Sequence, residues 1–186
     1  MDSMKKIKFV ISGFLLLASF AMHAQKFYTK SGKISFFSST PLEDIAATNK
    51  SVVALLDSKT GDLQFAAQMK GFEFRKALMQ EHFNSDYVES NKFPKSEFKG
   101  QVTTNSEINY TTNGTYTAKV KGKLTIHGVT KDIETTGSIT VKDGKLTLGS
   151  SFDVLIADYK ITIEKLYRDN IAKSVKVTID CTLGPM

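Results

Sequence analysis

The sequence predicts an all-β protein, an eight-stranded antiparallel β-barrel with one or two short helical insertions. Hydrophobic and polar residues alternate along most of the chain, turn residues separate the alternating stretches, and several stretches contain a glycine. The length of 186 residues suits one domain with a core of its own. The hydrophobic fraction of 41% and the charged fraction of 24% are ordinary for a globular protein and argue against disorder.

The alternation is clearest near the end of the chain. Val175, Val177 and Ile179 fall on one face of an extended segment, whereas Lys176 and Thr178 fall on the other. This period of two is typical of a strand with one buried face. The same pattern predicts strands over residues 27–37, 63–69, 116–126, 129–141, 146–156 and 175–183.

Turn signals separate these strands. Gly or Asn, which tolerate the positive φ of a tight hairpin, occur in residues 58–62, 111–114 and 142–145, and His127-Gly128 marks another connection. Strands joined by such short turns must be antiparallel.

Glycines inside the strand patterns indicate how the sheet bends. Gly100, Gly122 and Gly137 interrupt strands, where glycine often marks a bulge or a sharp bend. A strongly bent sheet favours a closed barrel over a sandwich, and closure also removes exposed edges.

Two segments depart from the strand pattern. Thr40-Pro41-Leu42-Glu43 resembles a capping box with proline at the first helical position, so we expect a short helix that continues to Ala47. Residues 74–89 also suit a helix, which would end before Pro94. One apolar stripe of this second helix would contain Phe74, Leu78, Phe83 and Tyr87.

The first 24 residues have the pattern of a secretory signal peptide. Lys5, Lys6 and Lys8 precede an apolar stretch over residues 9–20, and Ala24 offers a small residue for cleavage. We therefore expect residues 25–186 to be the barrel domain and its location to be periplasmic or secreted. No second apolar run approaches the roughly 20 residues of a membrane helix, so we expect no integral membrane span.

The sequence lacks the usual signatures of catalysis and cofactor binding. It contains no Gly-x-Ser-x-Gly, Gly-x-Gly-x-x-Gly or P-loop motif, so we expect neither an enzyme nor a cofactor. Beyond the signal peptide only His82 and His127 remain as histidines, which is too few for an ordinary metal site. Cys181 has no partner for an intrachain disulfide, and its place in a strand predicts a buried core residue.

The positive charge does not indicate a nucleic-acid-binding protein. The formal net charge is +6, but the basic residues are spread along the chain as on a solvated strand surface. Export also argues against nucleic acid as a partner. The sequence leaves the oligomeric state open, a homodimer included.

Several longer segments resemble the YceI-like family. They are residues 74–84, 87–100 and 122–131, and residues 32–38 resemble a variant of the family's opening. The resemblance covers nearly all of the chain after residue 24 and implies a lipocalin-like barrel, an exported or periplasmic location, and a long polyisoprenoid or similar amphiphilic lipid in the lumen. Many members have Trp and His in the first strand, where this chain has Phe27 and Tyr28 and no Trp.

An eight-stranded barrel can hold one slender ligand. The chain has 13 Phe and 6 Tyr, and several of them are in or near the helical segment. The candidates for the lining or the mouth are Phe72, Phe74, Leu78, Met79, His82, Phe83, Tyr87, Phe93, Phe98, Phe152 and Tyr159. The candidates for contact with a ligand head group are Arg75, Lys76 and Lys92, each of which is otherwise a solvated charge.

The leading hypothesis is an exported protein that carries or sequesters such a lipid in the cell envelope. A second hypothesis is a ligand-free module for envelope stress or protein interaction, which would have a solid core. A third is a lipid hydrolase or isomerase that uses Glu81 and His82. For this pair we prefer a structural role, a hydrogen bond that ties the helical segment to a strand.

Overall fold

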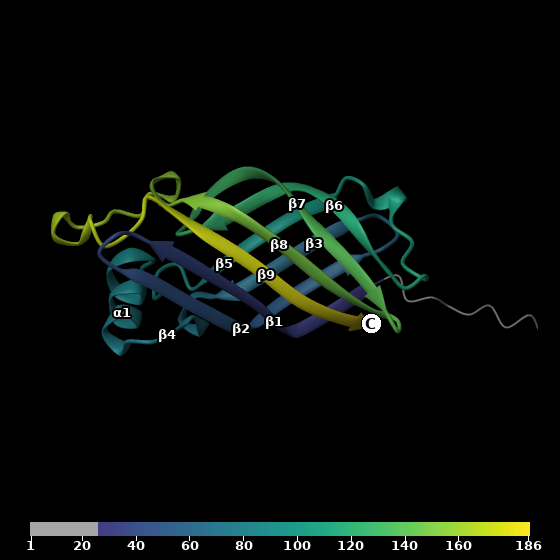
Figure 1. Cartoon of the computed structure of the whole chain (residues 1–186), viewed down its shortest axis with the longest axis horizontal. Coiled ribbons are helices and arrows are strands. Elements are labelled where there is room, and N and C mark those ends of the chain that lie inside the picture. Colours follow the sequence, from purple (N-terminus) through teal and green to yellow (C-terminus); the bar gives the residue numbers. More distant parts are fainter. Residues whose placement is uncertain (1–25) are drawn as a thin grey trace, which may run out of the picture.

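The computed structural model describes residues 26–186, and in it eight strands close into an antiparallel barrel (Figure 1). The predicted signal peptide, residues 1–24, lies outside the described residues. Around the barrel the order is β1, β9, β8, β7, β6, β5, β3 and β2, and β2 pairs with β1 to complete the ring. The strands are β1 (Lys26–Ser39), β2 (Asp44–Asp57), β3 (Asp62–Gln68), β5 (Lys95–Val102), β6 (Gly114–Ile126), β7 (Val129–Lys142), β8 (Lys145–Leu155) and β9 (Ser174–Pro185). The predicted fold class is therefore confirmed.

Two hairpins have the tight turns that their sequences predict. His127 and Gly128 join β6 to β7 with φ angles of 50° and 70°. Asp143 and Gly144 join β7 to β8 with φ angles of 50° and 73°. Positive φ at both central residues is the geometry whose twist matches that of paired strands.

The prediction of a helix over residues 40–47 is wrong. Residues 40–43 form the turn between β1 and β2, and Ala46 and Ala47 already pair with Phe37 and Phe36. The hydroxyl of Thr40 accepts hydrogen bonds from the backbone N–H groups of Leu42 and Glu43, at 3.3 and 3.1 Å. Thr40 thus accepts hydrogen bonds from the same backbone N–H groups that it would cap at the start of a helix, but here the chain turns back into the sheet.

The helical prediction for residues 74–89 is confirmed for most of its length. Helix α1 (Ala77–His82) continues into a π-helical turn, η2 (Phe83–Tyr87). The short strand β4 (Glu73–Phe74) precedes α1 and pairs with β2. Four 3₁₀ turns complete the described elements: η1 (Met69–Gly71), η3 (Asn105–Glu107), η4 (Ile156–Tyr159) and η5 (Lys165–Tyr167).

A glycine pair allows β5 and β6 to approach each other closely. Gly100 and Gly122 are direct partners, and the ring of Phe98 lies against both. A Cβ added at Gly122 would lie 2.5 Å from the Cα of Gly100 and 2.7 Å from the Phe98 ring. A side chain here would therefore displace either the strand or the ring.

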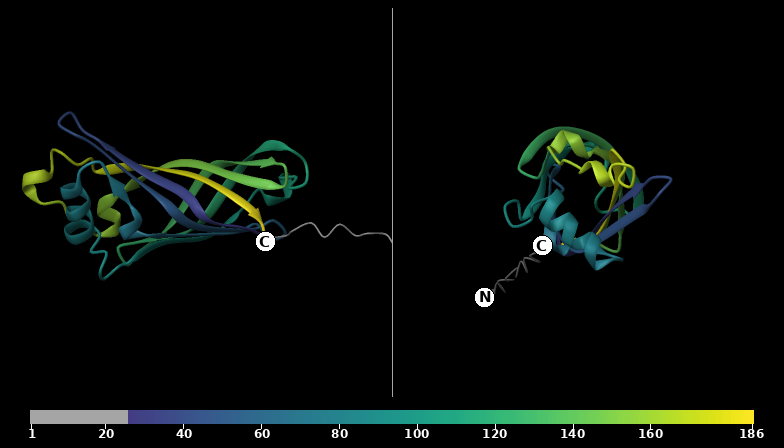
Figure 2. Two further views of the ribbon diagram at one scale, coloured as in Figure 1. Left: turned by 90° about the horizontal axis from the view of Figure 1, so that it is seen from below. Right: turned by 90° about the vertical axis from the view of Figure 1, so that its left-hand side faces the viewer.

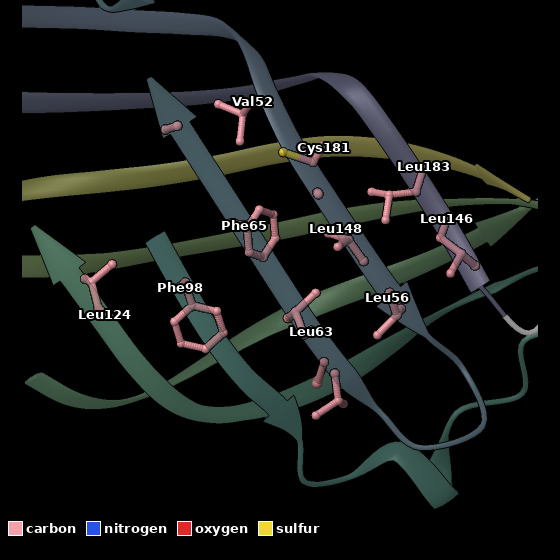
Figure 3. Packing of buried hydrophobic residues seen from close by; sticks show 14 of the residues in the cluster. Val52, Leu56, Leu63, Phe65, Phe98, Leu124, Leu146, Leu148, Cys181 and Leu183 are labelled. Atoms are coloured by element: carbon pink, nitrogen blue, oxygen red, sulfur yellow. The ribbon is translucent and has the colours of Figure 1, made fainter. Parts of the chain in front are cut away.

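One end of the barrel is packed solid. Figure 3 shows Leu56, Leu146 and Leu183 pointing into a common space, and all three are fully buried. Each such leucine contributes about 1.5–3 kcal/mol relative to an exposed one. Cys181 belongs to this packing, as expected, and burial raises the pKa of its thiol to about 11. Because the thiolate is the reactive form, this cysteine is suited to packing rather than to nucleophilic chemistry.

Phe27 and Tyr28 belong to the first strand at this packed end. Phe27 is buried and stacks on Tyr110 with ring centroids 6.4 Å apart. The Tyr110 hydroxyl donates to the Asn105 side-chain oxygen at 2.6 Å, and burial raises the pKa of Tyr110 to about 12.

The opposite end of the barrel carries the helical elements. Figures 1 and 2 show α1, η4 and η5 together at this end, far from the end of the barrel where the chain terminates. No helix within residues 26–186 has both the length and the hydropathy to cross a membrane.

We predict that Gly122→Ala lowers the free energy of unfolding by about 1–3 kcal/mol, because the added methyl overpacks the contact with Gly100 and Phe98. Gly184→Ala is the matched control, since nothing lies within 4 Å of a Cβ at that position, and it should stay within about 0.5 kcal/mol of wild type. Urea unfolding measures both. Equal stability of the two variants would contradict the proposed role of the glycine pair.

Candidate ligand-binding cavity

A cavity of about 430 Å³ occupies the part of the barrel toward the helical end. This volume is within the range typical of small-ligand sites. Its wall is overwhelmingly apolar and includes residues from all eight barrel strands, from α1 and η2, and from residues 156–171. The barrel is therefore filled by side chains at one end and hollow at the other.

Strand β9 shows the change from packed core to open cavity within one strand. Its inward side chains are fully buried at Cys181 and Leu183 but only half-buried at Val175, Val177 and Ile179. The half-buried side chains line the cavity. The same alternating pattern therefore places some inward side chains of β9 in the packed core and others on the cavity wall.

Four phenylalanines fix the helical segment to the mouth of the barrel. Phe83 of η2 contacts Phe36, Phe72 and Phe74, with ring centroids 5.0–5.8 Å apart. The geometries are tilted, edge-to-face or offset, and such pairs contribute about 0.5–1.5 kcal/mol beyond burial. All four rings also line the cavity, so the same cluster anchors α1 and forms part of the wall.

The structure brings most of the predicted lining residues together. The cavity wall contains Phe72, Phe74, Leu78, Met79, His82, Phe83, Tyr87, Phe98, Phe152 and Tyr159. Phe93 is outside it. Its ring packs edge-on against His127, with centroids 4.7 Å apart, and covers Gly128, where the absence of a side chain leaves room. Contact of the wall residues with a ligand stays a prediction.

The three predicted head-group residues have different positions. Lys76 lines the mouth, and its ammonium pairs with the Glu43 carboxylate at 2.9 Å. Lys92 lies outside the cavity wall, 3.7 Å from the Glu89 carboxylate and above the Phe93 ring. Arg75 is exposed and is also absent from the wall. Only Lys76 is placed to reach a group at the mouth.

Glu43 makes the mouth more polar than the rest of the wall. The hydrogen bond from Lys76 holds the pKa of the Glu43 carboxyl below its ordinary value, and Asn170 also donates to this carboxylate, at 3.4 Å. Glu43 stands out in the sequence only as part of a capping-box pattern and Asn170 not at all, and no pattern joins two residues that are 127 positions apart.

Deeper polar groups are already satisfied by the protein. The hydroxyls of Thr135 and Ser150 lie 3.3 Å apart on the wall, and Ser150 donates to the Thr136 carbonyl at 3.2 Å. Burial raises the pKa of Tyr87 and of Tyr159, so both phenols stay neutral and suit an apolar site.

The pair Glu81 and His82 does not converge on the cavity. His82 lines it, but Glu81 is exposed and outside its wall. His82 Nδ1 lies 2.9 Å from the Asp86 carboxylate, and its ring contacts Tyr167 edge-on. The preferred expectation of a tie to a strand is wrong, because His82 links α1 to η2 and to η5 instead. Among residues 26–186 no group of three or more potential metal ligands occurs.

His127, which the sequence places only at a turn, makes a polar tie between the helical segment and the barrel. Its Nε2 lies 2.7 Å from the Glu89 carboxylate and its Nδ1 lies 3.1 Å from the Tyr159 carbonyl. Both partners can accept hydrogen bonds, so each ring nitrogen of His127 faces an acceptor. The ring thus joins the β6–β7 turn, the exit of the helical segment and η4.

Together these features define a lipocalin-like β-barrel with an apolar cavity that opens at one end. The model of the YceI-like domain matches residues 5–183, and the chain belongs to this family. The resemblance seen in the sequence is confirmed. Comparison with curated proteins finds no significant match.

Solved structures with the same fold have low sequence identity. A polyisoprenoid binding domain from Saccharophagus degradans, implicated in plant cell wall breakdown, has a TM-score of 0.76 and 13% identity over 88% of this chain and 99% of its own. BcnA from Burkholderia cenocepacia has a TM-score of 0.67 and 14% identity over 82% and 96%. A YceI protein from Campylobacter jejuni has a TM-score of 0.51 and 19% identity over 71% and 78%.

We predict that the free energy of unfolding of Glu89→Gln falls less than that of wild type as the pH is lowered. The hydrogen bond from His127 lowers the pKa of Glu89 from its ordinary 4.5, so the ionised carboxylate stabilises the folded protein above that pH. This contribution is lost as the pH falls through the lowered pKa. Urea unfolding between pH 5.5 and about 3 measures the effect.

His127→Asn, whose shorter side chain lacks the Nε2 group that contacts Glu89, should flatten the same pH dependence, and combining it with Glu89→Gln should add little further change. If the free energy of unfolding of both single variants depends on pH as it does in wild type, the His127–Glu89 hydrogen bond does not contribute as predicted.

Proposed function

We propose that this protein binds a long-chain isoprenoid or similar amphiphilic lipid, with the hydrocarbon tail in the barrel and the head group at the mouth. The observation that supports this most strongly is the apolar cavity of about 430 Å³ that is closed at the packed end. The polyisoprenoid binding domain with the same fold adds support by analogy.

Hydrocarbon burial supplies enough free energy for binding without polar contacts. Each buried methylene contributes about 0.8 kcal/mol, so a five-carbon isoprene unit contributes about 3–4 kcal/mol before ordering costs. A few units would offset the cost of association, which is about 4–15 kcal/mol. The cavity should therefore select its ligand mainly by tail length and width.

Polar groups at the mouth are suited to the head group. Glu43, Lys76 and Asn170 form one hydrogen-bonded cluster there, and His82 and Tyr167 line the same end. Because Glu43 already neutralises Lys76, the cluster offers hydrogen bonds without a net positive charge. A neutral polar head group fits this arrangement at least as well as a phosphorylated one.

The alternatives fit the site less well. A ligand-free module would have a solid core, which does not agree with the hollow half of the barrel. A hydrolase or isomerase that uses Glu81 and His82 requires both groups in the cavity, and Glu81 lies outside its wall. We therefore propose a binding protein rather than an enzyme.

We predict that Val177→Trp strongly reduces the amount of bound lipid, because the indole would occupy space in the cavity that Val177 lines. Thr178→Trp is the matched control, since this neighbour on β9 is exposed on the outer face. Native mass spectrometry and solvent extraction of purified protein measure the bound lipid, and circular dichroism verifies folding. If wild type and Thr178→Trp both carry no lipid, the proposed function is wrong.

We further propose that the protein is exported and acts in the cell envelope, where it carries or sequesters its ligand. The support is the signal-peptide pattern of residues 1–24. The exported chain should begin at Gln25, which N-terminal sequencing of the periplasmic or secreted fraction tests. A protein that stays in the cytoplasm and keeps residues 1–24 would contradict this proposal.

A further inference from the structure

Most of the large exposed hydrophobic side chains lie at the end of the barrel that carries the cavity mouth. The complete set within residues 26–186 is Phe37, Leu42, Leu78, Leu155, Leu166 and Met186. The first five belong to elements or connections at the helical end of the barrel, whereas Met186 is at the other end (Figures 1 and 2). Exposed apolar surface that gathers in one region of a protein marks an interaction site for a protein or a membrane.

Three of these residues, which we call the mouth leucines, lie on three separate segments. Leu42 is in the β1–β2 turn, Leu78 in α1 and Leu166 in η5, with exposed fractions of 67%, 63% and 77%. Leu78 also lines the cavity, as does Tyr167 next to Leu166. The apolar surface therefore continues from the cavity wall to the outside of the molecule.

The charges around the mouth leucines balance. Residues 40–43, 75–87 and 156–173 together contain six basic and six acidic side chains. This surface therefore has no net charge to attract an anionic or a cationic partner over distance. Any partner must be recognised through the leucines themselves.

The distribution of the mouth leucines over three separate segments favours a bilayer over a protein partner. A specific protein interface buries about 800 Å² on each partner in one well-packed patch. Here single apolar side chains project from separate segments with charged residues between them. Such side chains can each enter the boundary between lipid head groups and acyl chains, where binding scales with the apolar area that is buried.

We propose that the mouth leucines insert into the surface of a lipid bilayer and place the cavity mouth against it. This inference rests on the proposed function, because a bilayer is also the source or destination of a lipid ligand. A tail could then move along Leu78 between the membrane and the barrel with little exposure to water.

The test is flotation of the mature protein with vesicles of phosphatidylcholine, alone or with phosphatidylglycerol. The variant Leu42→Asn/Leu166→Asn changes two mouth leucines that do not line the cavity. Each substitution should weaken vesicle binding about tenfold, which corresponds to about 1.4 kcal/mol, and the pair about a hundredfold. Met186→Asn, at the other end of the barrel, is the matched control and should bind as wild type does.

The lumen of the double variant should still hold as much lipid as wild type, because neither leucine is in the cavity wall. Wild-type vesicle binding by the double variant would overturn the inference. So would binding that requires phosphatidylglycerol and disappears at high salt, because the distributed basic surface would then be responsible. A protein that carries lipid but binds no vesicles would also overturn it and leave the proposed function intact. Vesicle binding without lumen lipid would contradict only the proposed function.

Discussion

Closure of the sheet is the constraint on which the rest of this structure depends. When β1 pairs with both β2 and β9, each inward side chain must either fill the lumen or face empty space. Leucines such as Leu56 and Leu183 fill it at one end, and the side chains of the wall leave a cavity at the other. The mouth, the helical segment and the ligand site all follow from this difference between the two ends.

Much of the fold could be predicted from the sequence because alternation and turn chemistry are local. The turn at Asp143-Gly144 and the strand that contains Val177 both follow from residue types within a few positions. Strand β2 was missed because Val52 to Leu56 are apolar on both faces, so the period of two is hidden. The capping pattern at Thr40 was misleading because a hairpin turn satisfies the same backbone donors as a helix start.

The candidate site was less predictable because its polar contacts join distant parts of the chain. Aromatic residues near the helical segment were good candidates for the wall, since a barrel end needs an apolar cover. Nothing in the sequence joins Glu43 to Asn170, or His127 to both Glu89 and Tyr159. Phe93 was selected for its residue type, although its side chain turns away from the lumen to pack on a tight turn.

The central claim is that buried hydrocarbon, rather than a specific head group, provides the free energy of ligand binding. The most direct test measures the dissociation constants of isoprenoid alcohols of increasing length. The account predicts that each added unit tightens binding until the cavity of about 430 Å³ is full, after which further units add nothing. Affinity that depends on the head group and not on tail length would contradict it.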